Sequence, residues 1–169
     1  MSDNEDLILD ICDHAIEVAR AVEGVNGRVV FGASNRTNAP DQAIANIIPR
    51  GDQIDEVEAD VQDDDDDFGT YSRSSAGIHR HNAGFILEVL QKGASLRNVI
   101  TLAARISKAF LESDWTDSEG RKLIHRIAMV ERDFLETPQE KASQQYAIAG
   151  IAFAVTFATE RGSPSRSAL

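Results

Sequence analysis

The residues that follow Ser95 carry the strongest helical pattern in the chain. Apolar side chains recur there at every third or fourth position: Leu96, Val99, Ile100, Ala103, Ile106 and Phe110. Ser95 is a typical N-cap residue for such a helix. Residues 3–23 have the same spacing, at Ile8, Ile11, Ala15, Val18 and Val22. An amphipathic helix needs an apolar surface to cover, so these two segments require the rest of the chain to supply one.

Apolar runs and alternations predict that this surface is a β-sheet. The predicted strands are residues 28–31, 43–48, 54–61, 78–90, 122–134 and 146–159. Pro49 and Gly51 are expected to end the second strand before the third begins. The order of helix, strands, helix and strands predicts an α+β fold, with a mostly antiparallel sheet and the two amphipathic helices packed on one face. The length of 169 residues suits one domain, which we place at residues 1–161, followed by a flexible C-terminal tail at 162–169.

The acidic residues are concentrated in one window. Residues 52–67 hold ten of the 28 Asp and Glu residues and no Lys or Arg, whereas the rest of the chain has 18 acids against 17 bases. The net charge of -11 is therefore a local property of this window. Consecutive aspartates repel one another and remain hydrated, so we predict an acidic loop near residues 62–76.

Charge and composition also exclude several classes of protein. A nearly neutral body without a basic face argues against nucleic-acid binding driven by counterion release. A single cysteine, Cys12, rules out an internal disulfide framework and a multi-cysteine zinc site. No apolar run approaches the roughly 20 residues that span a bilayer, and the start MSDNEDLILD is acidic where a signal peptide is basic. We therefore expect a soluble chain without a membrane partner.

No group of residues predicts catalysis or metal binding. His79 and His81 would point to one side of a strand, but no third ligand accompanies them. Cys12 and His14 diverge on a helix surface, so they do not form a nucleophile pair. The aspartates at 63–67 lack the ligand spacing of a calcium loop. We predict a protein that is not an enzyme and that needs no cofactor.

A metal-dependent nuclease remains the alternative from the enzyme class. Glu131 and Asp133 are paired strand carboxylates, and Asp114 could join them as a third. Such an enzyme needs a positive surface for its substrate, which the composition does not favour.

The last predicted strand has two unlike faces. One face carries Ile151, Phe153, Val155 and Phe157, and the opposite face carries the small residues Gly150, Ala152, Ala154 and Thr156. Small side chains let another layer approach closely, so Ala152, Ala154 and Thr156 are predicted to lie in a subunit interface. Thirteen of the 17 basic residues are Arg, which suits interface ion pairs, although solvated Arg residues explain this count equally well.

Most of the chain resembles the tail terminator (tail completion) proteins of long-tailed bacteriophages. The matching segments are AGFILEVLQ, NVITLAARISKAFLES, the turn SDWTDSEG with Asp114, KLIHRIAMVERDF and IAGIAFAVTFATE. The N-terminal DHAIEVARAVEGV and the segment from Ala43 to Pro49 also fit. The match is one of element order and apolar pattern, and the acidic window at 52–67 departs from it.

The resemblance implies a structural virion protein, made in the cytoplasm of a host bacterium and located in the tail or neck. Such a subunit forms a homo-oligomeric ring, a hexamer, that ends polymerisation of the tail tube and joins the tail to a neck or head-completion protein. Genomic DNA would pass through the ring without specific binding. The acidic segment, with Asp60, Asp63, Asp64, Asp65, Asp66 and Asp67, would then face the channel or dock a basic partner.

Two other hypotheses about the function stay open beside the nuclease. One is a neck or head-tail adaptor ring in the same virion, since such rings are also built from small subunits. The other is a monomeric adaptor whose acidic loop binds a basic partner.

Overall fold

The computed structural model describes residues 6–32, 41–57, 78–136, 146–160 and 163–167. Two helices and six strands are assigned in this part of the chain. The helices are α1 (Leu7–Arg20) and α2 (Leu96–Glu112). The strands are β1 (Val29–Phe31), β2 (Ile44–Val57), β3 (Ile78–Lys92), β4 (Arg126–Glu136), β5 (Tyr146–Glu160) and β6 (Ser163–Ser167).

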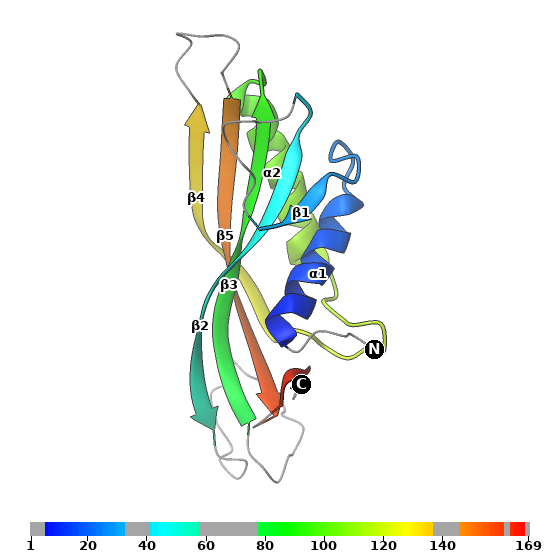
Figure 1. Cartoon of the computed structure of the whole chain (residues 1–169), viewed down its shortest axis with the longest axis vertical. Helices are drawn as coiled ribbons and strands as arrows, with labels where there is room; N and C mark the ends of the chain where they lie inside the picture. The colour runs from blue at the N-terminus through cyan, green and yellow to red at the C-terminus, as the bar shows by residue number, and fades with distance from the viewer. Residues whose placement is uncertain (1–5, 33–40, 58–77, 137–145, 161–162, 168–169) are drawn as a thin grey trace.

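All six strands belong to one sheet. Its order is β1-β2-β3-β5-β4, with β6 paired to β5. Every pairing is antiparallel except that of β1 with β2. Both helices lie on the same side of this sheet (Figure 1). The predicted α+β class is confirmed.

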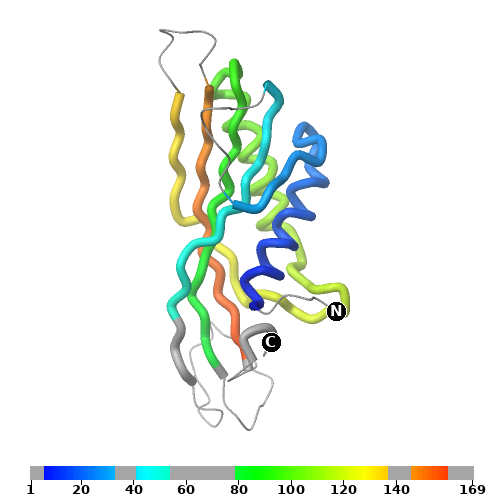
Figure 2. The backbone as a smooth tube through the Cα atoms, in the orientation of Figure 1, coloured from blue at the N-terminus to red at the C-terminus, as the bar shows by residue number. Residues whose placement is uncertain are grey.

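The long strands β2, β3 and β5 extend past the region that the helices cover. Figure 2 shows this as a twisted sheet whose upper part faces α1 and α2 and whose lower part continues beyond them. The right-handed twist of neighbouring strands accumulates over strands of this length. Because both helices lie on one side, the same sheet has a covered inner face and an open outer face.

The inner face holds the core. The side chains of Phe85, Leu87 and Val89 on β3 are fully buried there, as the alternation of the sequence predicts. Phe85, Phe110 and Phe153 contact one another with ring centroids 5.3–5.5 Å apart, so an aromatic cluster joins β3, α2 and β5. Aromatic pairs at this separation add to the hydrophobic gain of burial.

The helix ends differ from the prediction in detail. Helix α1 begins at Leu7, and Asp6 caps it by accepting a 3.0 Å hydrogen bond from the Ile8 amide. Its last residue is Arg20, so residues 21–23 fall outside the helix, and Gly24 follows with a φ of +96°. Ser95 occupies the N-cap of α2 as predicted, but its side chain makes no capping hydrogen bond.

Trp115 anchors the end of α2, a role that was not predicted from the sequence. Its indole N–H donates a 2.7 Å hydrogen bond to the carbonyl of Phe110, one of the carbonyls that a helix end leaves without an intrahelical donor. The ring is 3% exposed and its backbone has a φ of +46°. A tryptophan just after an amphipathic helix is the signal that could have indicated this role.

The prediction of two strands separated at Pro49 and Gly51 is wrong. β2 continues through both residues, and Pro49 pairs with Phe85. β1 pairs only with Ala45 to Ile47, so the rest of β2 lies at an edge, where a residue without an N–H is tolerated. Gly51 falls in the register shift between Arg50 and Gln53, which a bulge absorbs without ending the strand.

Two further segments differ from the prediction. β4 begins at Arg126 and not at residue 122, because Leu123 and Ile124 are both buried and break the alternation. Residues 162–169 were predicted to be a flexible tail, but Ser163–Ser167 within them form β6, which pairs antiparallel with the end of β5. This strand is held by backbone pairing with β5, and its sequence has no apolar pattern that would predict it.

Candidate assembly surfaces

The outer face of the sheet contains the predicted interface residues. Alternation along β5 places Ala152, Ala154 and Thr156 opposite the core side. On β3 their register partners are Ile86, Gly84 and Asn82, and on β4 they are Glu131, Ala128 and Arg126. Ala152 is only 5% exposed, while Ala154 and Thr156 are half-buried. The structure therefore brings these three residues onto one face, but it does not present them as a flat exposed patch.

Gly84 lies at the centre of this face. It pairs with Ala154, and a Cβ atom at position 84 would lie 2.4 Å from the carbonyl oxygen of Phe153. That contact is with the backbone, which cannot rotate away as a side chain can. The floor of the outer face therefore requires glycine here.

Long side chains from the two flanking strands meet above this floor. The guanidinium of Arg50 on β2 lies 3.9 Å from the carboxylate of Glu131 on β4. β2 and β4 are separated by β3 and β5, which in a flat sheet would be about 14 Å at the usual spacing of strands. The pair can form because the face is concave and its floor is small.

The concave face contains a hollow of about 280 Å³, which we call the outer trough. Its floor is apolar apart from Glu88, and its rim carries Arg50, Glu131 and Asp133. The lining residues are Ile48, Arg50, Ile86, Glu88, Glu131, Asp133, Leu135, Ile148, Gly150 and Ala152.

A buried polar pair lies in the floor of the outer trough. The side-chain amide of Asn46 donates a 3.0 Å hydrogen bond to the carboxylate of Glu88, and the two residues are 0% and 4% exposed. A carboxylate that is removed from water needs such donors. The sequence analysis did not single out this pair, although polar residues at the centre of two apolar strands were a visible signal.

The two outer strands of the sheet expose apolar side chains. On β4 these are Met129, Val130, Phe134 and Leu135, which are 37–59% exposed. On β1 they are Val30 and Phe31, at 40% and 51%. Val130 falls in the register shift of β4 against β5, so it has no direct partner there.

His81 is part of a buried polar contact and not of a metal site. Its Nδ1 lies 2.6 Å from the carboxylate of Asp52, and its Nε2 lies 2.9 Å from the hydroxyl of Thr159. Its ring stacks on Phe157 at 4.5 Å. The ring of His79 is 6.5 Å away, so the two histidines are neighbours. With both nitrogens engaged, His81 has no lone pair left for a metal ion.

Most of the acidic segment lies outside the described residues. This holds for Asp60 and for Asp63, Asp64, Asp65, Asp66 and Asp67, whose predicted role stays a prediction. Asp52, the first acid of the window, is described and is bound to His81. At least this acid is therefore tied to the sheet.

Cys12 and His14 do not form a reactive pair. Burial, followed by the nearby charge of Asp13, raises the pKa of the Cys12 thiol to about 12, which keeps it protonated at neutral pH. His14 instead bonds Ser113 through Nε2 at 2.8 Å and packs on Trp115. Burial lowers the pKa of His14, although Glu17 opposes the effect.

The carboxylates of the nuclease alternative are not gathered around one point. Glu131 and Asp133 share the outer side of β4 and line the outer trough, whereas Asp114 follows α2 and does not line it. Within the described residues, no group of three or more His, Cys, Asp and Glu side chains is placed to hold a metal ion. None of the helices in this part of the chain is long and apolar enough to cross a membrane.

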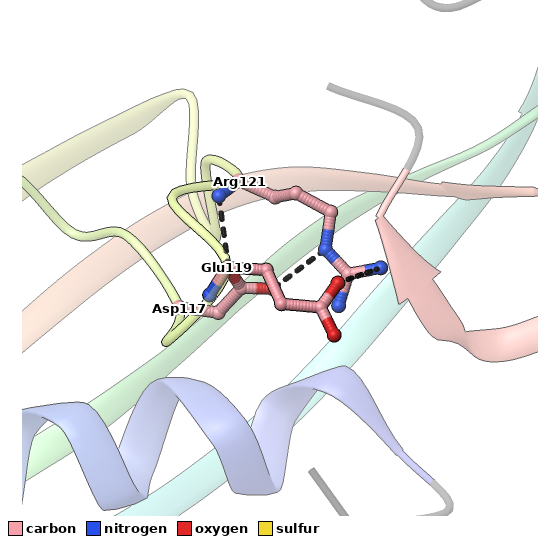
Figure 3. A network of polar contacts seen from close by, with 3 residues as sticks. All are labelled: Asp117, Glu119 and Arg121. Carbon is pink, nitrogen blue, oxygen red and sulfur yellow. Dashed lines mark hydrogen bonds and ion pairs between the residues drawn. The ribbon is translucent and has the colours of Figure 1, made fainter. Parts of the chain in front are cut away.

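The turn that leads into β4 is held by its own charges (Figure 3). Arg121 donates to Asp117 through Nε at 2.7 Å, and the same carboxylate accepts from the amides of Glu119 and Arg121. Desolvation acts to raise the pKa of Asp117, but these hydrogen bonds outweigh it and hold the pKa below its ordinary value. The network stabilises the turn.

Comparisons with known proteins were made by family, by sequence and by structure. No family model matches the chain, and no curated protein matches it. Among solved structures, the chain is similar to one from a structure titled "Virion of native gene transfer agent (GTA) particle". The two are 15% identical over 84% of this chain and 90% of that chain, with a TM-score of 0.47. The likeness is one of chain arrangement alone.

Proposed function

We propose that this protein is a structural component of a phage-type virion, a tail terminator that forms a hexameric ring at the head-proximal end of the tail tube. The observation that carries the proposal is the element order. The segments that resemble tail terminators are present as α1, β1, β2, β3, α2, β4 and β5, in one sheet with both helices on one face. This arrangement leaves the opposite face open for another protein.

The proposed mechanism is steric. A ring copies the symmetry of the tube on one side and withholds the next polymerisation surface on the other, so the tube stops growing. The outer face, with Ala152, Ala154 and Thr156, would pack against another subunit of the virion. No covalent step is required for this role, and we propose that the protein is not an enzyme.

The acidic segment suits a ring through which DNA must slide. Six copies of a segment with charge -10 would repel the DNA backbone if they lay near the channel. At physiological ionic strength the field reaches only about 8 Å, so the segment would have to lie close to the lumen. If it lies outside, it would instead contact a basic neck protein.

Mass measurement and negative-stain imaging of the purified protein test the proposal. We expect a ring, or a monomer that becomes a ring when tail tubes are added, with density at one end of each tube. A strict monomer that never associates with tubes would contradict it. Rings that bind the portal end of emptied heads and ignore tubes would identify a neck adaptor instead.

A further inference from the structure

The exposed apolar side chains are concentrated on the outer strands of the sheet. Seven large apolar residues are exposed in the described part of the chain, and six of them lie on β1 or β4. We call Val30 and Phe31 the β1 patch, and Met129, Val130, Phe134 and Leu135 the β4 patch. The seventh residue, Leu111, is on α2.

Single exposed apolar residues are common, but this distribution is not a scatter. Four of the eleven residues of β4 are large, apolar and at least 37% exposed. An outer strand also presents backbone donors and acceptors without a neighbour, and proteins usually protect such edges with charge or a bulge. β4 has both, since its bulge and its charged Glu131, Arg132 and Asp133 separate two apolar pairs. The remaining apolar surface is typical of a contact site.

The placement of the two patches decides what kind of contact they suit. β1 and β4 stand at opposite ends of the strand order, and the patches differ in size. A two-fold dimer uses the same patch on both copies, whereas a head-to-tail contact uses two different patches. Head-to-tail contacts close into rings when the rotation between copies allows it.

We propose that the β4 patch of one copy packs against the β1 patch of the next copy, so that the lateral contacts of the ring are made by opposite edges of the sheet. This inference rests on the proposed function, from which we take the closure of these contacts into a ring. Leu135 belongs to the β4 patch and also lines the outer trough, so the next copy would border the trough on its β4 side.

The charges beside the patches fit such a contact. Exposed Arg28 directly precedes β1. Exposed Glu131 and Asp133 lie between the two apolar pairs of the β4 patch, together with Arg132, whose guanidinium lies 5.2 Å from the centroid of the Phe134 ring. β4 carries three acids and two arginines in total, so its edge is slightly negative where the β1 edge offers Arg28. Opposite charges at the rim of an apolar contact favour the correct pairing over others.

Engineered cysteines test the proposal. Native Cys12 is fully buried and its thiol pKa is raised, so we expect it not to react with maleimides. The double variant Val30→Cys/Val130→Cys, treated with a short bismaleimide in the assembled state, is expected to give a ladder of covalent oligomers up to the ring. A mixture of the two single variants is expected to give dimers only, and each single variant alone is expected to give none.

The matched control is Leu111→Cys combined with Val130→Cys, because Leu111 is equally exposed but lies on α2. We expect at least about tenfold more cross-linking from the Val30/Val130 pair than from this control, because assembly raises the local thiol concentration to roughly millimolar. Dimers from Val130→Cys alone would show a two-fold contact between β4 strands and would overturn the proposal.

Imaging the same samples separates this inference from the proposed function. If rings form and cap tubes but the Val30/Val130 pair does not cross-link above the control, the edge contact is wrong and the terminator role stands. If the ladder forms but the oligomers do not bind tubes, the edge contact stands and the terminator role is wrong. If neither rings nor ladders form with tubes present, both are wrong.

Discussion

The two faces of this sheet are made by the same strands but are stabilised in different ways. On the inner face, Phe85 and Phe153 pack against α2 as a dry aromatic cluster. On the outer face, Gly84 and Ala154 form a small floor beneath the Arg50–Glu131 pair. The inner face is closed by the chain's own helices, whereas the outer face is closed only in part, by side chains from its flanking strands. Residues on the inner face therefore maintain the fold, whereas residues on the outer face are available for assembly.

The largest expected effect comes from the inner face. Phe85→Ala removes a fully buried ring from the aromatic cluster and leaves a cavity, so we expect it to lower the free energy of unfolding by about 3–5 kcal/mol. The adjacent Ile86→Ala, on the half-buried outer side, is expected to cost only about 1–2 kcal/mol. Urea denaturation of both variants measures the contrast, and equal losses would mean that the two faces are equally packed.

Gly84→Ala is expected to have the next largest effect. Its methyl group would meet the carbonyl of Phe153, so β3 and β5 must separate locally at a cost of roughly 1–3 kcal/mol. Gly51→Ala is the control, because no atom lies within 4 Å of a Cβ at that position. Thermal unfolding should show a clear loss for Gly84→Ala and little change for Gly51→Ala. An unchanged melting temperature for Gly84→Ala would contradict the close approach of the two strands.

Ala154→Trp is expected to affect assembly more than stability. The indole would project from the half-buried floor of the outer face, so the free energy of unfolding should change by no more than about 1 kcal/mol. Binding to tail tubes, measured by co-sedimentation, should be lost. Ala154→Ser keeps the residue small and should bind as the wild type does. Normal tube binding by Ala154→Trp would exclude this part of the face from the interface.

The smallest expected effect lies outside the sheet, at Asp117. Its pKa is lower in the folded protein than in the unfolded chain, so its contribution to stability is present above its unfolded pKa and is lost as the pH falls through the folded value. Because such a surface ion pair contributes at most about 1 kcal/mol, the effect is small. Melting temperatures of wild type and Asp117→Asn should differ slightly at pH 6, and the difference should shrink as the pH falls below 3.8, the ordinary pKa of the carboxyl. A gap that widens in acid would contradict this sign.

The inner face was predictable because burial leaves a periodic trace in the sequence. The apolar alternation of Phe85, Leu87 and Val89 and the helical spacing up to Phe110 identified the core, the two helices and the fold class. The course of β2 was not predictable in the same way. Pro49 and Gly51 usually end a strand, but among the described residues β1 pairs with β2 only as far as Ile47, and an unpaired edge tolerates proline.

The candidate surfaces were predictable only in part. The small face of β5 was identified from Ala152, Ala154 and Thr156, but the pair that arches over it joins residues 50 and 131, and no local spacing links these positions. Val30 and Phe31 resembled core residues in the sequence. Their exposure depends on β1 being the last strand of the sheet, which is a property of the strand order.

The buried sides of α1, α2, β3 and β5 can therefore be predicted from the sequence, because the hydrophobic effect acts on every apolar side chain and leaves a local pattern. The sequence also shows that the acidity of the chain is concentrated in residues 52–67. The identity of the edge strands, the curvature of the sheet and the distant charges that meet above its outer face all depend on the tertiary structure. Those properties arise from pairing between segments far apart in the chain, and such pairing leaves no periodic signal in any one of them.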